Sequence, residues 1–212
     1  MNPSKPLLRS AAVLGLFALL ALGLVALVHD HTQERIAANT RARWLSTLET
    51  LIPAGSFDND LLADTVMASD SALGSSQPVT VYRARQGGEP VAAVLSPVAP
   101  DGYNSPITLL VAIRRDGVLA GVRVLEHRET PGLGDLIEVD KSGWILGFEG
   151  RSLDDPPEHR WRVKRDGGDF DQFAGATITP RAVVKAVYRT LVFFRSRRDR
   201  LFDASPGTVL RE

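Results

Sequence analysis

The sequence predicts an α+β protein, in which a single N-terminal transmembrane helix precedes a domain with an antiparallel sheet and flanking helices. Three observations lead to this prediction. Residues 11–28 form an uncharged apolar run, short apolar or β-branched segments recur between residues 79 and 125, and a helical pattern with an apolar face begins at Pro180. A sheet with helices at its ends and on one face is typical of the α+β class.

The composition is that of a globular protein without thiol chemistry. The 212 residues are 44% hydrophobic and 24% charged, which suits one domain with an appendage. Because 25 Lys and Arg residues balance 25 Asp and Glu residues, charge gives no reason to expect nucleic acid. The absence of cysteine excludes disulfides, thiolate-bound iron–sulfur clusters and covalent c-type haem. The histidines offer only a weak H-x-H pair at residues 29 and 31, so no metal site is expected.

Residues 11–28 are long and apolar enough to cross a bilayer, since 18 residues of helix span roughly 27 Å. Lys5 and Arg9 precede the run, and Asp30 and Glu34 follow it. The positive-inside rule therefore gives residues 1–28 a cytoplasmic N-terminus and a transmembrane anchor, with the later residues on the other side of the membrane. The alternative is a cleaved signal peptide, but the run is long for one and lacks a small-x-small cleavage site.

Residues 29–78 are expected to connect the anchor to the folded domain. A helix is predicted over residues 30–52, because apolar residues recur there at i+4 steps, and Pro53 ends it. Its apolar stripe favours packing rather than a binding site. Residues 54–78 are rich in Ser, Asp, Gly and Ala without a clear period, which predicts a loop with some helix.

An antiparallel meander is predicted in the domain at residues 79–200. Turn signals such as Arg115-Asp116-Gly117 separate its strands. The strands are expected at residues 79–83, 90–95, 107–113 and 118–125.

The helix from Pro180 should pack its apolar face on this sheet, and residues 201–212 are expected to form a tail. The arginines of RSRRDR, residues 195–200, suit the C-terminal end of a helix. Contact with anionic lipid headgroups or an acidic partner is the alternative interpretation.

The first candidate binding loop is HRETPGLG, residues 127–134. Pro131 fixes the backbone, while Gly132 and Gly134 remove side chains, so peptide groups can approach a planar ligand closely. Glu129 and Thr130 add an acceptor and a donor at its edge. Taken alone, the pattern also fits an ordinary loop at the end of a strand.

The second candidate loop is DQFAGATIT, residues 171–179. Gly175 and Ala176 are small and leave the Thr177 hydroxyl uncovered, and Thr179-Pro180 fits a helix N-cap followed by proline at the first helical position. A helix N-terminus favours phosphate, so a phosphate ester at this hydroxyl is the sharper interpretation. On spacing alone, a capped helix after a turn of small residues is the commoner explanation.

DQFAGAT resembles the flavinylation motif of the FMN-binding domain in the G subunit of the Rnf ion-translocating complex and in the C subunit of the Na⁺-pumping NADH:quinone reductase. The resemblance implies that Thr177 carries FMN through a phosphoester bond, six residues after Asp171. Thr179 matches a second threonine of the family and is the competing attachment point. Ala174 stands where the family usually has Ser or Thr.

ETPGLG resembles the other signature of this family and is implied to line the flavin. GYNSPI, residues 102–107, is similar to the family's GYxGxI, with Ser105 in place of a glycine, and residues 161–168 resemble the strand and turn before the flavinylation loop. The resemblance therefore covers nearly the whole chain. The residues that it implies for FMN binding are Asp171, Gly175, Ala176, Thr177, Thr179, Glu129, Thr130, Gly132, Leu133 and Gly134.

The resemblance implies a membrane-anchored electron-transfer subunit that carries covalent FMN, in a complex that couples electron flow between ferredoxin and NAD to ion translocation. The implied partners are membrane lipid, the A, B, C, D and E components of the Rnf complex, and a flavin transferase. Because the sequence contains no catalytic triad or nucleotide fingerprint, we expect one component of a translocase rather than an enzyme on its own. The alternatives are the C subunit of the Na⁺-pumping reductase, which is usually longer, a flavin-bearing sensor, and a non-redox anchored binding or scaffold domain.

Overall fold

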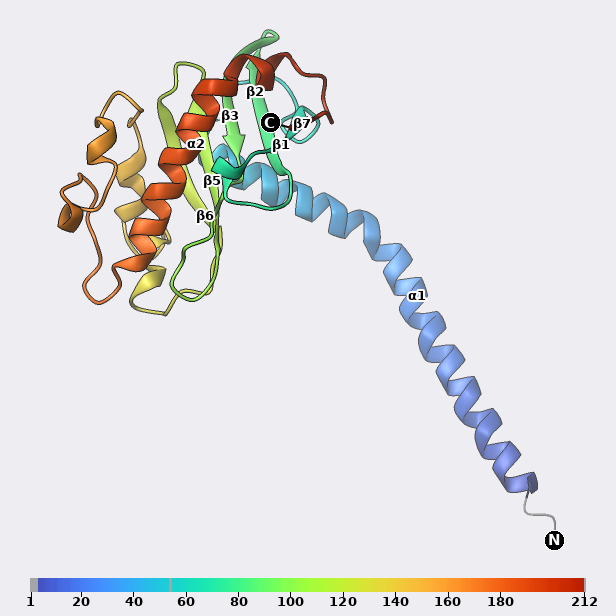
Figure 1. Cartoon of the computed structure of the whole chain (residues 1–212). Coiled ribbons are helices and arrows are strands. Elements are labelled where there is room, and N and C mark those ends of the chain that lie inside the picture. The colour runs from blue at the N-terminus through green and yellow to red at the C-terminus, as the bar shows by residue number, and fades with distance from the viewer. Residues whose placement is uncertain (1–3, 54, 212) are drawn as a thin grey trace. The chain divides into compact units, whose positions relative to one another are not determined.

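A computed structural model describes the backbone of residues 4–53 and 55–211, with all side chains beyond residue 54 and only part of those in residues 4–43. The chain divides into two compact units, Met1–Trp44 and Leu45–Glu212. Most of helix α1 belongs to the first unit, while the sheet and helix α2 belong to the second (Figure 1).

Helix α1 runs without interruption from Ser4 to Glu49, so the apolar run and the predicted helix after it form one element, which ends before the predicted end at residue 52. The described apolar side chains of residues 13–26 are exposed.

Among the residues that the structure describes, no helix combines the length and the apolarity that a membrane crossing requires. The span expected over residues 11–28 is therefore not found in the described part of the chain. The side chains of residues 11, 12, 27 and 28 lie outside the described residues, as do those of Lys5, Arg9, Asp30 and Glu34.

Seven strands form one mixed sheet in the second unit. The strands are β1 (Thr65–Ser69), β2 (Val79–Gln86), β3 (Glu89–Leu95), β4 (Val98–Ala99), β5 (Ile107–Arg114), β6 (Leu119–Glu126) and β7 (Val209–Arg211). The order is β5-β3-β2-β1-β7, with β6 on the other side of β5. The short β4 continues β3 along β5, since Leu95 pairs with Val111 and Val98 pairs with Thr108.

The α+β class and the four predicted strands are confirmed, but the sheet is not purely antiparallel. Strand β7 lies parallel to β1, and all other neighbours are antiparallel. Strands β1 and β7 occur where a loop and a tail were predicted. Both are short, and their pairing with each other spans a long sequence separation, so no local pattern marks it.

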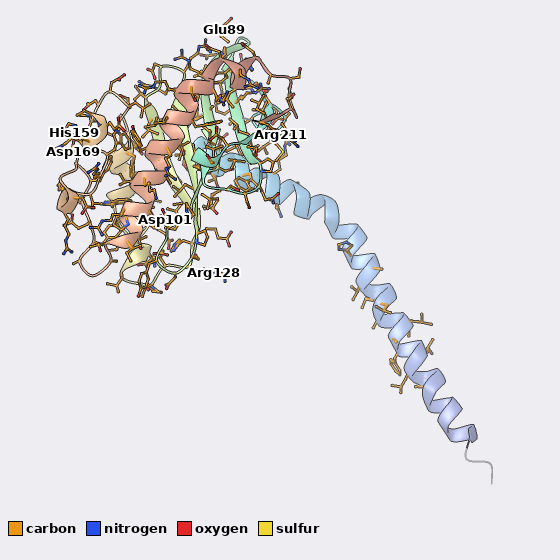
Figure 2. All side chains as sticks on the ribbon, in the orientation of Figure 1. Glu89, Asp101, Arg128, His159, Asp169 and Arg211 are labelled. Carbon is orange, nitrogen blue, oxygen red and sulfur yellow. The ribbon has the colours of Figure 1, made fainter. Side chains whose placement is uncertain are left out.

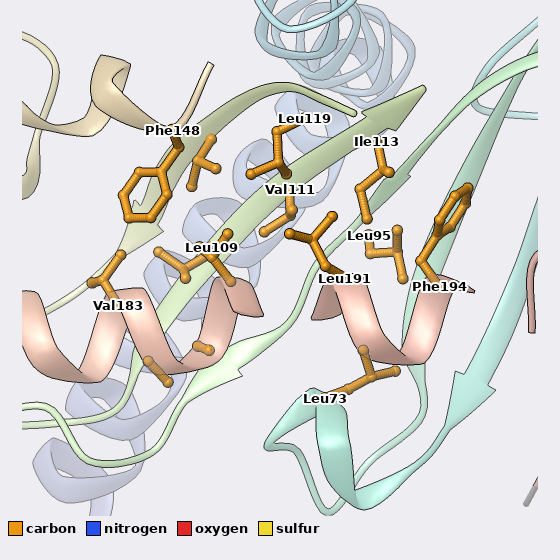
Figure 3. Packing of buried hydrophobic residues seen from close by; sticks show 14 of the residues in the cluster. Leu73, Leu95, Leu109, Val111, Ile113, Leu119, Phe148, Val183, Leu191 and Phe194 are labelled. Atoms are coloured by element: carbon orange, nitrogen blue, oxygen red, sulfur yellow. The ribbon is translucent and has the colours of Figure 1, made fainter. Parts of the chain in front are cut away.

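Helix α2 (Ile178–Asp203) covers one face of the sheet, and the main hydrophobic core lies between them (Figure 3). Val183, Leu191 and Phe194 point from the helix toward the strands, where Leu109 and Val111 meet them. This confirms the expected packing of the C-terminal helix. The predicted start at Pro180 is wrong by two residues.

The opposite face of the sheet carries small residues at its centre. Ala112 pairs with Val94 on one side and with Gly121 on the other. A Cβ atom at Gly121 would lie 2.9 Å from Cδ2 of Leu51. The segment just after α1 therefore packs closely against the sheet, and a larger side chain at Gly121 would displace it.

Two arginines of β2 donate hydrogen bonds to carbonyl groups at the C-terminal end of α2. Arg83 is 1% exposed and donates to the carbonyl oxygens of Leu201, at 3.0 Å, and Ala204, at 2.5 Å. Arg85 donates to the carbonyl of Phe202, and Asp64 holds both guanidinium groups. The carbonyls that a helix leaves without partners at its C-terminal end thus find cationic donors.

Residues 127–177 lie between β6 and α2 and fold into short 3-10 turns. The 3-10 helices in this segment are η2 (Gly134–Ile137), η3 (Trp144–Phe148), η4 (Glu158–Arg160) and η5 (Lys164–Asp166). A further one, η1 (Ser71–Leu73), lies between β1 and β2. The strand expected within residues 161–168 is reduced to a single bridge between Val163 and Phe170. Stacked aromatic rings, such as Phe148 on Phe170 at 4.7 Å, join this segment to the core.

Candidate functional site

The loop before α2 makes a tight turn that presents Thr177. Gly175 has φ of +79°, which glycine adopts without strain, and the N–H of Ala176 donates to the carbonyl of Phe173 at 3.2 Å. Helix α2 starts at Ile178, so its N-cap residue is Thr177. The N-cap predicted at Thr179 is therefore wrong. Proline at the third helical position fits, because N–H groups in the first turn have no intrahelical partner.

Thr177 makes no side-chain capping bond to the helix that it precedes. Its backbone has φ of −90° and ψ of −19°, unlike the extended backbone of most N-cap residues. The half-buried hydroxyl therefore lies beside the N-terminal end of α2, where free N–H groups and the helix dipole favour an anion.

Thr179 has a different environment from Thr177. It is 1% exposed, and its hydroxyl donates a short hydrogen bond to Oε2 of Glu129. Of the two threonines expected as attachment points, Thr179 is thus the one that is buried and whose hydroxyl already makes a hydrogen bond.

The Glu129 carboxylate is the centre of the site. It is 5% exposed and accepts hydrogen bonds from the N–H of Asn104 at 2.9 Å and of Tyr103 at 3.2 Å, besides the bond from Thr179. Burial raises the pKa of this carboxyl group. The bonds from the Thr179 hydroxyl and from the backbone of residues 103–105 outweigh burial, so the pKa of Glu129 lies below its ordinary value of 4.5.

The rest of ETPGLG folds back over its own backbone. The carbonyl of Thr130 accepts the N–H groups of Leu133, at 3.1 Å, and Gly134, at 3.0 Å. Gly132 has φ of +76°. A Cβ atom at Gly134 would lie 2.8 Å from Cβ of Glu129 and 3.1 Å from the Thr179 hydroxyl, so glycine is required there by close approach.

The turn at residues 102–105, which leads into β5, is hydrogen-bonded to this loop. The Asn104 side-chain amide donates to the carbonyl of Arg128 at 2.9 Å and to the Thr130 hydroxyl at 3.2 Å. The Ser105 hydroxyl, which replaces a glycine of the family pattern, accepts the N–H of Arg128 at 3.1 Å. Figure 2 shows Asp101 and Arg128 at the same end of the domain, far from Glu89.

These segments enclose a cavity of about 320 Å³, at the lower end of the range of small-molecule sites. Its lining residues are Tyr103, Glu129, Thr130, Leu133, Gly134, Gly175, Ala176, Thr177, Ile178 and Thr179. The two loops singled out from the sequence therefore meet at one cavity.

Tyr103 and Ile178 line the cavity but were not among the expected site residues. Both are exposed and add apolar surface at its rim. Tyr103 lies within GYNSPI, so the family-like motif was the signal that could have found it.

Two expected residues, Gly132 and Asp171, are not part of the lining. The Asp171 side chain is exposed and forms an ion pair with Lys164 at 2.6 Å, while its carbonyl accepts the Trp144 indole N–H at 2.8 Å. Asp171 thus fixes the start of the loop.

The arrangement suits a flat ligand with a phosphate group. Leu133, Ile178 and the Tyr103 ring provide apolar contact surface, and peptide groups of the glycine loops lie at the edge. The N-terminal end of α2 supplies an anion site next to the Thr177 hydroxyl. FMN has both of these parts, so the residues present fit that group.

Comparison with known proteins agrees with this geometry. Residues 102–192 match the FMN-binding domain family, and residues 1–51 match the RnfG N-terminal region family. Every residue that lines the cavity falls within the first match.

Relatives from several bacteria share nearly the full length of the chain, and each is named as the G subunit of an ion-translocating oxidoreductase complex. The protein of Pseudomonas aeruginosa is 52% identical over 199 residues, covering 93% of this chain and 92% of its own. That of Shewanella loihica is 49% identical over 200 residues, covering 94% of both. That of Pseudoalteromonas atlantica is 46% identical over 198 residues, covering 93% and 92%.

Replacing Gly134 by alanine should destabilise the domain, because the new methyl group would collide with Glu129 and Thr179. We expect a loss of about 1 to 3 kcal/mol, the usual cost of overpacking, from urea unfolding. Gly143→Ala is the matched control, since a Cβ atom there meets nothing within 4 Å and φ is −76°. Equal stability of the two variants would contradict the close approach at Gly134.

The ionised Glu129 carboxylate should make stability depend on pH. Its pKa is lowered on folding, so its contribution is complete well above pH 4.5 and is lost as the pH falls through the folded-state pKa. Urea unfolding from about pH 7 to about pH 3 should therefore show a difference between the wild type and Glu129→Gln that shrinks on acidification. Glu89→Gln, at an exposed carboxylate, is the control. A difference independent of pH would contradict the assignment.

Proposed function

Because this chain belongs to the family of G subunits of ion-translocating oxidoreductase complexes, we propose that it carries FMN in the cavity between ETPGLG and the start of α2, joined through a phosphoester to Thr177. Its function is electron transfer within a complex that couples this transfer to ion movement. The observation that supports the site best is the Thr177 hydroxyl, which lines the cavity at a helix N-terminus without a capping bond.

Three features favour Thr177 over Thr179 as the attachment point. Thr177 is more accessible, its hydroxyl makes no capping bond, and it precedes the helix. Thr179 would have to break its bond to Glu129 and leave a buried carboxylate with one partner fewer.

The linkage requires an activated FMN donor of the phosphoanhydride class and a flavin transferase. The Thr177 Oγ1–phosphorus bond would form as the anhydride P–O bond breaks, the other phosphate of the donor would leave with the bridging oxygen, and the hydroxyl proton would pass to a base. The α2 N-terminus stabilises the negative charge of the resulting phosphate diester. Asp171 is exposed at the start of the loop and is therefore accessible to the transferase.

When bound, FMN supplies the capacity to accept and release one or two electrons. The chain's own residues hold the ligand and exclude water. Leu133 and Ile178 provide apolar walls, and Glu129 holds three segments of the site in register. A covalent link also prevents loss of the ligand where its free concentration is low.

The partners are the other subunits of the complex, and we propose that this chain relays electrons rather than catalysing a reaction alone. The relatives match over nearly their whole length and share one name, which favours this assignment over the C subunit of the Na⁺-pumping reductase. It also removes the reason to prefer a non-redox binding domain.

We further propose that residues 11–28 anchor the chain in the inner membrane, with the folded domain on the periplasmic side. The uncharged composition of this run and the distribution of charges around it support the proposal. The exposed apolar side chains of residues 13–26 need an apolar environment.

Co-expression with a flavin transferase should give one FMN adduct, located on Thr177 by peptide mass spectrometry. Thr177→Ala should lose the adduct because the attacking oxygen is gone, and the matched Thr177→Ser should keep it. An adduct on Thr179 would retain the function and move the site. No adduct, with the transferase active on another substrate, would overturn the proposal of covalent FMN.

The absence of cysteine allows a direct test of the anchor and its orientation. A Ser205→Cys variant should stay with membranes after alkaline carbonate extraction, and a membrane-impermeant maleimide should label it in cells with a permeabilised outer membrane. Residue 205 is exposed, so the thiol is accessible. Replacing Leu16 and Leu20 by lysine should release the chain. Labelling only after lysis would contradict the periplasmic location.

A further inference from the structure

His127 follows β6 and makes a hydrogen bond with each of its ring nitrogens. Its Nδ1 accepts the backbone N–H of Glu129 at 3.0 Å, two residues later in the chain. Its Nε2 lies 2.9 Å from Oε1 of Glu138, directly after η2. The ring is largely buried, with 13% of the side chain exposed.

These partners assign the tautomer of the ring. A nitrogen that accepts an N–H has no proton of its own, so Nδ1 of His127 is unprotonated. The carboxylate of Glu138 can only accept, so Nε2 carries the proton and donates it. The two bonds therefore use the neutral ring fully.

The two contacts bracket the ETPGLG loop. Residues 129–134 lie between them in sequence, and Glu129, Thr130, Leu133 and Gly134 of that loop line the cavity. The imidazole joins the first residue of the loop to Glu138, which follows it. His127 itself is not part of the lining.

We propose that His127 is a positioning residue that clamps the base of this loop and so fixes the Glu129 carboxylate relative to the bound ligand. This inference rests on the proposed FMN site only for its effect on the flavin. The clamp follows from the contacts of His127, Glu129 and Glu138 alone.

The side chain of asparagine provides a matched rescue. Asparagine commonly accepts the N–H of the residue two positions later, the bond that Nδ1 makes here. His127→Asn should therefore retain the bond to Glu129, whereas His127→Leu fills a similar space and retains neither bond. Arg128→Ala is the control for a change next to the clamp, because the contacts of Arg128 with residues 104 and 105 use its backbone.

The first test is hydrogen exchange by mass spectrometry on the full chain, which needs no flavin. We expect the fastest exchange in residues 129–134 for His127→Leu, an intermediate rate for His127→Asn, which keeps only the bond to Glu129, and exchange close to the wild type for Arg128→Ala. Peptides from β3 and β5 report whether the whole domain opens. Glu138→Ala, which removes the other partner, should give the same intermediate rate as His127→Asn and keeps the test decisive if His127→Leu does not fold.

The second test is the midpoint potential and the visible absorption spectrum of FMN in the loaded protein. Both should shift in His127→Leu, because the carboxylate near the flavin is no longer fixed, and both should return partway toward wild-type values in His127→Asn, which keeps the bond to Glu129. Loading of Thr177 is measured separately, so an unloaded wild type would refute the proposed FMN site while the exchange experiment still judges the clamp.

Three results would count against the inference. Unchanged loop exchange in both His127→Leu and Glu138→Ala would show that the contacts hold nothing in place. Faster exchange in His127→Leu without any shift in potential or spectrum would leave a structural clamp and remove its role toward the ligand. Exchange in His127→Asn as fast as in His127→Leu would exclude the bond at Nδ1 as a cause of the protection.

Discussion

The site depends on one buried carboxylate and the hydrogen bonds that it accepts. Glu129 accepts hydrogen bonds from two other segments of the chain. The backbone N–H groups of residues 103 and 104 donate from one, and the Thr179 hydroxyl at the start of α2 donates from the other. Burying a carboxylate without such donors would cost free energy. The folded site is therefore stable only when the three segments are in contact. The cavity is the space that remains between them.

The two ends of α2 have opposite roles. At the C-terminal end, Arg83 and Arg85 satisfy the carbonyl groups, and Asp64 compensates their charge. At the N-terminal end, Thr177, Ile178 and Thr179 line the cavity, and Thr177 makes no side-chain capping bond. The helix is thus fixed at the end far from the cavity and left open to an anion at the near end.

Local patterns in the sequence predict most of the fold and only part of the site. The strands at the centre of the sheet are apolar runs between glycine turns, and such runs need no distant partner to be recognised. Strands β1 and β7 depend on each other across the whole domain, so neither stands out locally. The two loops were found because their small residues and resemblance to a known family mark them. The bond from Thr179 to Glu129, the start of α2 at Ile178 and the position of Tyr103 depend on tertiary contacts.

The parallel pairing of β1 with β7 also sets an order of events during synthesis. Residues 171–179, where we place the cofactor, emerge before β7 and before the carbonyls that Arg83 binds. Until residues 201–211 are available, β1 has an open edge and the Arg83 guanidinium lacks its carbonyl acceptors, although Asp64 is present. An open edge can pair with other chains. The proposed attachment sequence therefore exists before the domain around it is closed. A maturation enzyme that requires the folded loop must wait for the carboxyl-terminal strand.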